Sequence, residues 1–154
     1  MSTVPYLYIL VRTDVASMNP GKMAAQCAHA SNDFMEGAVN LLSGESFEHK
    51  DELGSMIFDW KDHLGTQMTY GTTIVLDGID EPTISSVFSH MHHRQTTDWN
   101  NRSLSGVIVD PSYPIRDGKV THHLPLLTCG WVFTRKNNLV WRDLSNQFNL
   151  RLLK

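Results

Sequence analysis

The segment NPGKMAAQCAHA, at residues 19–30, holds four side chains that can do chemistry: Lys22, Gln26, Cys27 and His29. Lysine offers a positive charge, glutamine a hydrogen-bonding amide, cysteine a nucleophile and histidine a base. The Pro-Gly pair before Lys22 is typical of a helix start. Free backbone N–H groups and the helix dipole favour an anion there, and Lys22 adds a full charge. The segment therefore predicts an anion site, in which Gly21 lets a ligand approach the backbone.

A helical period divides these side chains between two stripes of one helix. The polar stripe has Lys22, Gln26, His29 and Asp33, and the mostly apolar stripe has Met23, Cys27, Ala30 and Phe34. Because buried cysteine behaves as a small hydrophobe, we expect Cys27 to pack rather than to act as a nucleophile. The alternative for Lys22, Gln26 and His29 is that they are ordinary surface residues. Spacing alone leaves both interpretations open.

The elements that position these residues are predicted from hydrophobic patterning. Four apolar runs predict buried strands at residues 6–11, 72–77, 105–110 and 126–133. Helical patterns lie at residues 20–43, 47–64, 80–93 and 137–148, with Asn19 and Asp80 as N-caps of the first and third. This order predicts an α/β fold with one domain over residues 1–154: a three-layer sandwich with helices on both faces of a mixed four-stranded sheet. Ligands then belong at the carboxyl ends of the strands.

Two polar segments, residues 93–103 and 111–125, interrupt this pattern and are predicted as loops. The sequence RDGK at residues 116–119 predicts a turn at the tip of a small hairpin. Basic and aromatic side chains gather in the two segments: Arg94, Trp99, Arg102, Tyr113, Arg116 and Lys119. They predict a surface that grips an RNA end by phosphate contacts and stacking, with scattered loop charges as the alternative.

Composition limits the partners and the compartment. Thirteen Lys and Arg residues against 16 Asp and Glu give a net charge of -3, so any RNA contact requires a local basic patch. Two cysteines, the absence of a signal-peptide pattern and the absence of a long apolar run predict a cytoplasmic protein that does not contact a membrane. The histidines at residues 90–93 and 122–123 complete no zinc pattern, so we expect no metal.

The residues YILVRTDVASMNPGKMAAQCAHAS, at positions 8–31, resemble the first strand, loop and helix of the type II peptidyl-tRNA hydrolases of archaea and eukaryotes. The family pattern there includes Gly-Lys-Xaa-Ala-Ala-Gln-Cys-Xaa-His-Ala. The resemblance implies hydrolysis of the ester between a peptide and the 3′ ribose of tRNA, with peptidyl-tRNA as partner and no metal or other cofactor. It also implies a homodimer, because family members are often dimers.

The resemblance implies a catalytic set of Lys22, Gln26, His29 and Asp110. Lys22 would stabilise the oxyanion or bind the terminal phosphate, Gln26 would position the ester or ribose, and Asp110, with His29, would orient or deprotonate water. The substrate-binding residues would be Gly21, Ser112, Tyr113, Arg116 and Lys119. Asp110 matches the aspartate that opens the family's Asp-Ala-Gly-Arg-Thr-Gln segment.

This chain departs from the family pattern after Asp110, where it reads PSYPI at residues 111–115 instead of Ala-Gly-Arg-Thr-Gln-Ile. Ser112 or Tyr113 would supply a hydroxyl there, and Thr121 or Thr128 would replace a threonine that the family has before its last strand. Three alternatives stay open. In the first, Asp110 only caps a turn. In the second, the domain is inactive and binds an RNA end or a protein partner. In the third, the enzyme acts on another ester or amide attached to a nucleotide.

Overall fold

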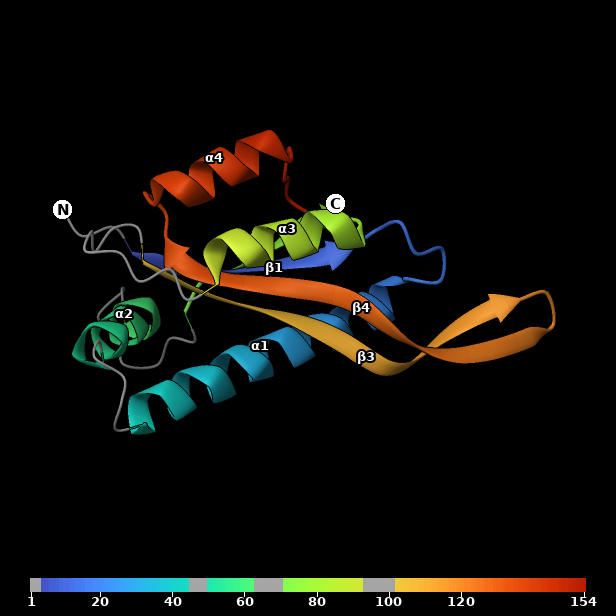
Figure 1. Ribbon diagram of the computed structural model, residues 1–154, viewed down its shortest axis with the longest axis horizontal. Coiled ribbons are helices and arrows are strands. Elements are labelled where there is room, and N and C mark those ends of the chain that lie inside the picture. Colours follow the sequence, from blue (N-terminus) through green and yellow to red (C-terminus); the bar gives the residue numbers. More distant parts are fainter. Residues whose placement is uncertain (1–3, 45–49, 63–70, 93–101) are drawn as a thin grey trace.

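A computed structural model describes residues 4–44, 50–62, 71–92 and 102–154 (Figure 1). Its sheet contains β1 (Pro5–Arg12), β2 (Thr73–Ile79), β3 (Ser103–Asp117) and β4 (Val120–Arg135) in the order β2-β1-β4-β3. β1 is parallel to β2 and antiparallel to β4, which is antiparallel to β3. The predicted mixed four-stranded sheet is therefore confirmed.

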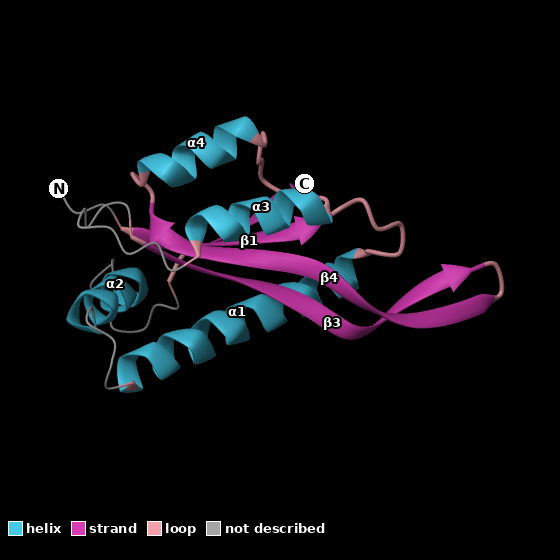
Figure 2. Cartoon of the chain, in the orientation of Figure 1, coloured by secondary structure: helices cyan, strands magenta, loops and turns pink. Residues whose placement is uncertain are grey.

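Helices cover both faces of this sheet (Figure 2). They are α1 (Pro20–Ser43), α2 (Lys50–Asp62), α3 (Glu81–Met91) and α4 (Leu139–Gln147). Side chains of β1 alternate between the two faces, as the pleat of a strand requires. Leu7 packs with residues of α1 and α2, and Leu10 packs with residues of α3 and α4. The predicted α/β fold with helices on both faces is confirmed.

The N-terminal caps of α1 and α3 agree with their predicted positions. The side chain of Asn19 accepts a hydrogen bond from the backbone N–H of Lys22 at 3.0 Å. Asp80 accepts one from the backbone N–H of Thr83 at 2.9 Å. Each cap satisfies a backbone donor that has no partner inside the helix. The predicted ends of α2, at residues 47 and 64, lie outside the described residues. No helix in the described part of the chain has the length and apolar character needed to cross a membrane.

The prediction of a loop over residues 111–125 is wrong, because β3 and β4 stay paired as far as Asp117 and Val120. The chain turns between them with Gly118 at a φ of 58°, as the turn signal predicted. Pro111 and Pro125 favoured a loop in the sequence. Both lie at an irregularity between residues 110 and 113 of β3, where the regular ladder is interrupted and proline is tolerated.

The far part of this hairpin projects from the body of the molecule (Figure 1). We call residues 114–123 the arm. Most of its side chains are exposed, in contrast to the second half of β4, where every residue from Thr128 to Arg135 is buried. The other segment predicted as a loop begins with residues 93–101, which include Arg94 and Trp99 and lie outside the described residues. Arg102 forms an ion pair with Glu52 of α2.

Candidate active site

Gln26 lies on the buried line of α1 and points toward the sheet. Its side chain is 4% exposed, and the other buried residues of the helix follow it at four-residue spacing: Ala30, Phe34 and Ala38. His29, which the sequence groups with Gln26 on one polar stripe, is exposed, whereas Gln26 is buried. Residues four positions apart stay near one side of an α-helix, so the polar residue Gln26 shares the buried side of α1 with these apolar residues. A buried amide requires hydrogen-bond partners.

Those partners come from two strands that are distant in the sequence. The hydroxyl of Thr128, in β4, donates to Oε1 of Gln26 at 2.6 Å. The Nε2 of Gln26 donates to Oδ2 of Asp110, in β3, at 3.0 Å. The other carboxylate oxygen of Asp110 accepts the backbone N–H of Ser112 at 3.0 Å. We call Gln26, Asp110 and Thr128 the central triad.

Within the central triad, hydrogen bonding fixes the orientation of the Asp110 carboxylate, which is only half-buried. Because Thr128 occupies the amide oxygen, Gln26 turns its N–H donors toward Asp110. Both oxygens of Asp110 accept hydrogen bonds, and each has a further lone pair for a water or a ligand. The arrangement is a preorganised acceptor near the carboxyl end of β1, where the fold predicts ligand binding.

Lys22 precedes Gln26 by one turn of α1. Its Nζ lies 4.9 Å from the centroid of the Tyr113 ring, a cation–π contact. Tyr113 is buried, and its hydroxyl lies 3.3 Å from Oγ of Ser17 and 3.7 Å from Sδ of Met18. The tyrosine thus supports the lysine, and its buried ring leaves no open face for stacking on a base.

His29 and Asp110 line one hollow of about 330 Å³ between α1 and β3. Asp33 and Glu36 of α1 line the same hollow, which makes its helical wall acidic. His29 therefore shares a solvent space with the carboxylate of Asp110, while Gln26 reaches Asp110 from the buried side.

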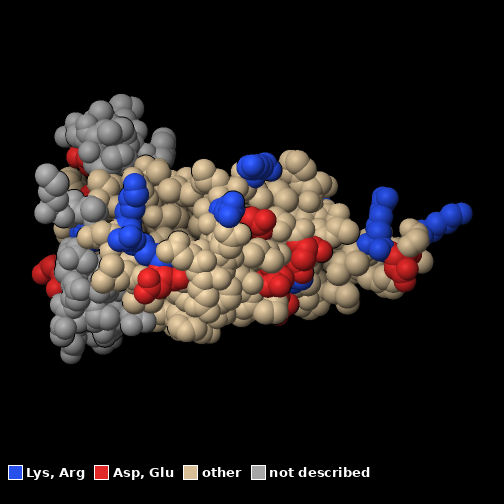
Figure 3. All heavy atoms as spheres, turned by 90° about the horizontal axis from the view of Figure 1, so that it is seen from above, with Lys and Arg blue, Asp and Glu red and all other residues tan. Residues whose placement is uncertain are grey.

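The remaining predicted binding residues are dispersed. Gly21 is exposed at the start of α1, where an added Cβ would meet only Oδ1 of Asn19 at 3.5 Å, an ordinary contact. Ser112, next to the central triad, has its Oγ 3.3 Å from Nδ1 of His123. Arg116 and Lys119 are exposed on the arm. Figure 3 shows charged side chains of both signs at the arm's end.

Thr128 belongs to the central triad, although Thr121 was an equal candidate in the sequence. Thr121 is exposed on the arm and pairs with Arg116. The distinguishing signal is the setting of Thr128 inside the apolar run LLTCGWVF, because a hydroxyl in a buried strand must find a partner.

Neither cysteine is a candidate nucleophile, because both thiols are difficult to deprotonate. Burial raises the pKa of the Cys129 thiol to about 12 and also raises the pKa of Cys27. Both thiols stay protonated at neutral pH, which fits the expected packing role of Cys27. Among the described residues, no group of three His, Cys, Asp or Glu side chains is arranged to hold a metal ion.

The family model described as Peptidyl-tRNA hydrolase PTH2 matches residues 6–97, which is more than half of the chain. The chain therefore belongs to this peptidyl-tRNA hydrolase family. No curated protein matches the sequence. The family match includes Lys22, Gln26 and His29 and ends before β3, so Asp110 and Thr128 are joined to the matched region by the fold.

Proposed function

We propose that this protein hydrolyses the ester bond between a peptide and the 3′-terminal ribose of tRNA. Membership of the peptidyl-tRNA hydrolase family supports the reaction class. The observation that carries the proposal for this chain is the hydrogen-bonded central triad, whose Asp110 carboxylate is oriented by Gln26 and by the backbone N–H of Ser112. The proposal takes residues 1–154 as one domain that acts in the cytoplasm on peptidyl-tRNA, as a homodimer.

Asp110 is the proposed general base. A water hydrogen-bonded to its carboxylate attacks the ester carbonyl carbon, and the water proton passes to Asp110 directly or through His29. The bond between the carbonyl carbon and the ribose oxygen then breaks, and that oxygen takes up the proton from Asp110 as it leaves, which returns Asp110 to its carboxylate form. Lys22 and the N-terminus of α1 stabilise the negative charge on the tetrahedral intermediate. Gln26 keeps the carboxylate in place throughout.

The tRNA is proposed to approach from the side of Lys22 and the arm. Lys22, Arg116 and Lys119 supply positive charge there, whereas the chain as a whole has a net charge of -3. RNA affinity should therefore fall as salt concentration rises, because local phosphate contacts supply it.

One observation favours a second function, that of an inactive domain that binds an RNA end. The family's Arg-Thr-Gln segment after Asp110 is replaced by Pro111, Ser112 and Tyr113. Ser112 uses its N–H to hold Asp110, and Tyr113 is buried. This chain thus lacks an arginine and an amide at those positions, and measured turnover decides between the two functions.

The deciding experiment is peptide release from purified peptidyl-tRNA by the parent protein and by Lys22→Ala. We expect turnover by the parent and a decrease on the order of 10²-fold in kcat for Lys22→Ala, because one oxyanion donor is removed. Lys136→Ala is the matched control, since Lys136 is exposed just after β4. No turnover by the parent, together with intact RNA binding, would establish the inactive binding domain instead.

A further inference from the structure

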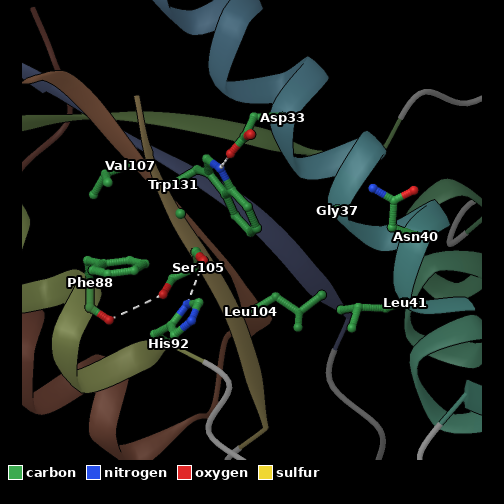
Figure 4. Close-up of a pocket in the computed structure, with 11 residues that line it drawn as sticks. Asp33, Gly37, Asn40, Leu41, Phe88, His92, Leu104, Ser105, Val107 and Trp131 are labelled. Atoms are coloured by element: carbon green, nitrogen blue, oxygen red, sulfur yellow. Dashed lines mark hydrogen bonds between the residues drawn. The ribbon is translucent and has the colours of Figure 1, made fainter. Parts of the chain in front are cut away.

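The outer edge of β3 borders two hollows that share Asp33. The hollow with His29 and Asp110, described above, has a volume of about 330 Å³, and the second has about 450 Å³. The second lies between α1 and α3, with Leu104, Val107 and Trp131 among its lining residues (Figure 4). Together they form what we call the β3 groove, which follows β3 from Leu104 to Asp110.

Backbone groups on alternate residues of β3 face this groove. The carbonyl oxygen of Arg102 accepts a hydrogen bond from Thr134 of β4 at 2.8 Å, and that of Ser105 accepts one from Nδ1 of His92, at the end of α3, at 3.2 Å. Up to the irregularity between Ile108 and Val109, even-numbered residues thus direct their backbone N–H and C=O groups toward β4, and odd-numbered residues direct theirs outward. Val107 therefore turns its N–H and C=O to the groove. In the described part of the chain, no strand lies on that side of β3.

The walls of the groove provide space and apolar surface. The Trp131 indole crosses Gly106, where an added Cβ would lie 2.5 Å from Nε1, and the same Nε1 donates to Asp33 at 2.7 Å. On the opposite wall, the ring of Phe88 lies 4.6 Å from that of His92, centroid to centroid. Gly37 lines the groove from the middle of α1, and an added Cβ there meets no described atom within 4 Å.

Charge determines which ligand suits the groove. No lysine or arginine is present among the described residues that line it, whereas Asp33, Glu36 and Asp110 are acidic. A phosphate backbone would be repelled here, and an uncharged extended chain would not. Open strand hydrogen bonds next to side-chain hollows are the features by which proteins bind peptides as an added strand.

We propose that the β3 groove binds the peptide part of the substrate as an extended strand that pairs with β3. This inference rests on the proposed function, because the ester must lie at Asp110. The peptide then runs from Leu104 toward Asp110, parallel to β3, with Val107 pairing to its backbone. At about 3.3 Å per residue, β3 extends roughly 20 Å from Leu104 to Asp110, which is the length of about six peptide residues. Peptide and tRNA thus occupy opposite sides of the central triad.

The test compares two substrates with the same ester, N-acetyl-valyl-tRNA and N-acetyl-Ala-Leu-Ala-Val-tRNA. We expect kcat/KM to be about tenfold higher for the longer peptide. Gly37→Trp should abolish this advantage by filling the groove and should leave hydrolysis of the short substrate unchanged. Val39→Trp is the matched control, because Val39 is 56% exposed on the same helix and does not line the groove.

A binding measurement separates this proposal from the proposed function. The probes are the same two acyl groups joined by an amide to 3′-amino-3′-deoxyadenosine, titrated against the parent, Gly37→Trp and Val39→Trp. Tighter binding of the longer probe, abolished only in Gly37→Trp, supports the groove even if the parent hydrolyses nothing. Methylation of single peptide nitrogens should weaken binding at alternate positions only, as strand pairing requires.

Equal affinity of the parent for the short and long probes would overturn the proposal, whether or not peptidyl-tRNA is hydrolysed. Equal weakening in Gly37→Trp and Val39→Trp would also overturn it, because the effect would then not come from the groove. Sedimentation of the parent and of Gly37→Trp tests whether a second copy of the chain, instead of a peptide, occupies the β3 groove. Dimers of the parent that dissociate in Gly37→Trp would assign the edge of β3 to subunit pairing instead of to the peptide.

Discussion

The central triad and the arm contain similar polar side chains but hold them in opposite ways. Gln26 is 4% exposed and Thr128 is fully buried, and each is hydrogen-bonded to a residue of another element. On the arm, Arg116 and Lys119 are exposed, and the side chains of His122 and Asp117 approach only to 3.9 Å. Strands β3 and β4 contribute to both regions, and α1 adds Gln26 to the central triad.

The difference shows what each region can contribute. A carboxylate held at fixed distances in a partly buried site can favour a transition state, because its geometry does not have to be organised during the reaction. Exposed charges on a projecting hairpin act through solvent, so they attract a polyanion but do not position one reacting atom. We therefore expect the central triad to determine kcat and the arm to affect only RNA binding.

The largest effect is expected for Asp110→Asn. Both oxygens of Asp110 accept hydrogen bonds, and an asparagine amide can accept on one side only. The weaker basicity and the missing hydrogen bond should decrease hydrolysis by on the order of 10² to 10⁴, with RNA affinity nearly constant. Single-turnover kinetics and RNA titration measure the two quantities.

The same substitution on the arm is the control for Asp110. Asp117 has an 87% exposed side chain, so Asp117→Asn should hydrolyse substrate like the parent. Parent-like turnover by Asp110→Asn would exclude Asp110 as the base and transfer that role to His29, which lines the same hollow.

A smaller decrease, on the order of tenfold in kcat, is expected for Thr128→Val. Without the hydroxyl, Oε1 of Gln26 has no buried donor, and the amide no longer has one preferred orientation toward Asp110. Removal of this hydrogen bond should also lower the free energy of unfolding by about 1 kcal/mol. Denaturant unfolding and kcat at saturating substrate measure these effects. Thr121→Val, on the exposed arm, should change neither quantity, and equal effects of the two variants would contradict the central triad.

Local signals predicted most of the fold. The caps Asn19 and Asp80 start α1 and α3 where the sequence indicated, because capping depends on a few adjacent residues. The turn at the tip of the arm was predicted, but the continuous pairing through residues 111–125 was missed. Pro111 and Pro125 are compatible with strands only at an irregular ladder position, and that position depends on pairing between residues distant in the sequence.

The candidate site was predictable in part for the same reason. The resemblance pointed to Gln26 and Asp110, whose side chains are indeed hydrogen-bonded to each other. Gln26 also accepts a hydrogen bond from Thr128, and the position of Thr128 relative to Asp110 depends on the register of β4 against β3, which no local pattern encodes. Tyr113 was expected to contact substrate, and only the packed structure reveals that it is buried beneath Lys22.

On the arm, the double variant Arg116→Ala/Lys119→Ala should weaken tRNA binding only a few-fold at physiological salt. The slope of log affinity against log salt should become shallower by about one for each phosphate that the variant no longer neutralises. Turnover at saturating tRNA should stay at the parent value. Lys136→Ala/Arg142→Ala is a control of equal charge, since both residues are exposed outside the arm. If both double variants weaken binding equally, net charge rather than the arm determines affinity.

The smallest effect on activity is expected from Cys129→Ala, although Sγ of Cys129 lies 3.4 Å from the backbone oxygen of Gln26. Burial raises the pKa of this thiol to about 12, so the thiol is neutral throughout the working pH range. The unfolded chain releases the thiol proton first, near a pH of about 8.5. The stability that this thiol contributes is therefore complete below that pH and is lost as the pH rises toward the folded pKa.

Denaturant unfolding at pH 8 and pH 10 of the parent and of Cys129→Ala measures this contribution. The parent should lose more stability between the two pH values than the variant, by up to about 1.4 kcal/mol per pH unit above the unfolded pKa. Hydrolysis at pH 7.5 should be the same for both proteins. A large decrease in activity in Cys129→Ala with unchanged unfolding would show that the thiol acts on the backbone of Gln26, which would extend the central triad by a fourth residue.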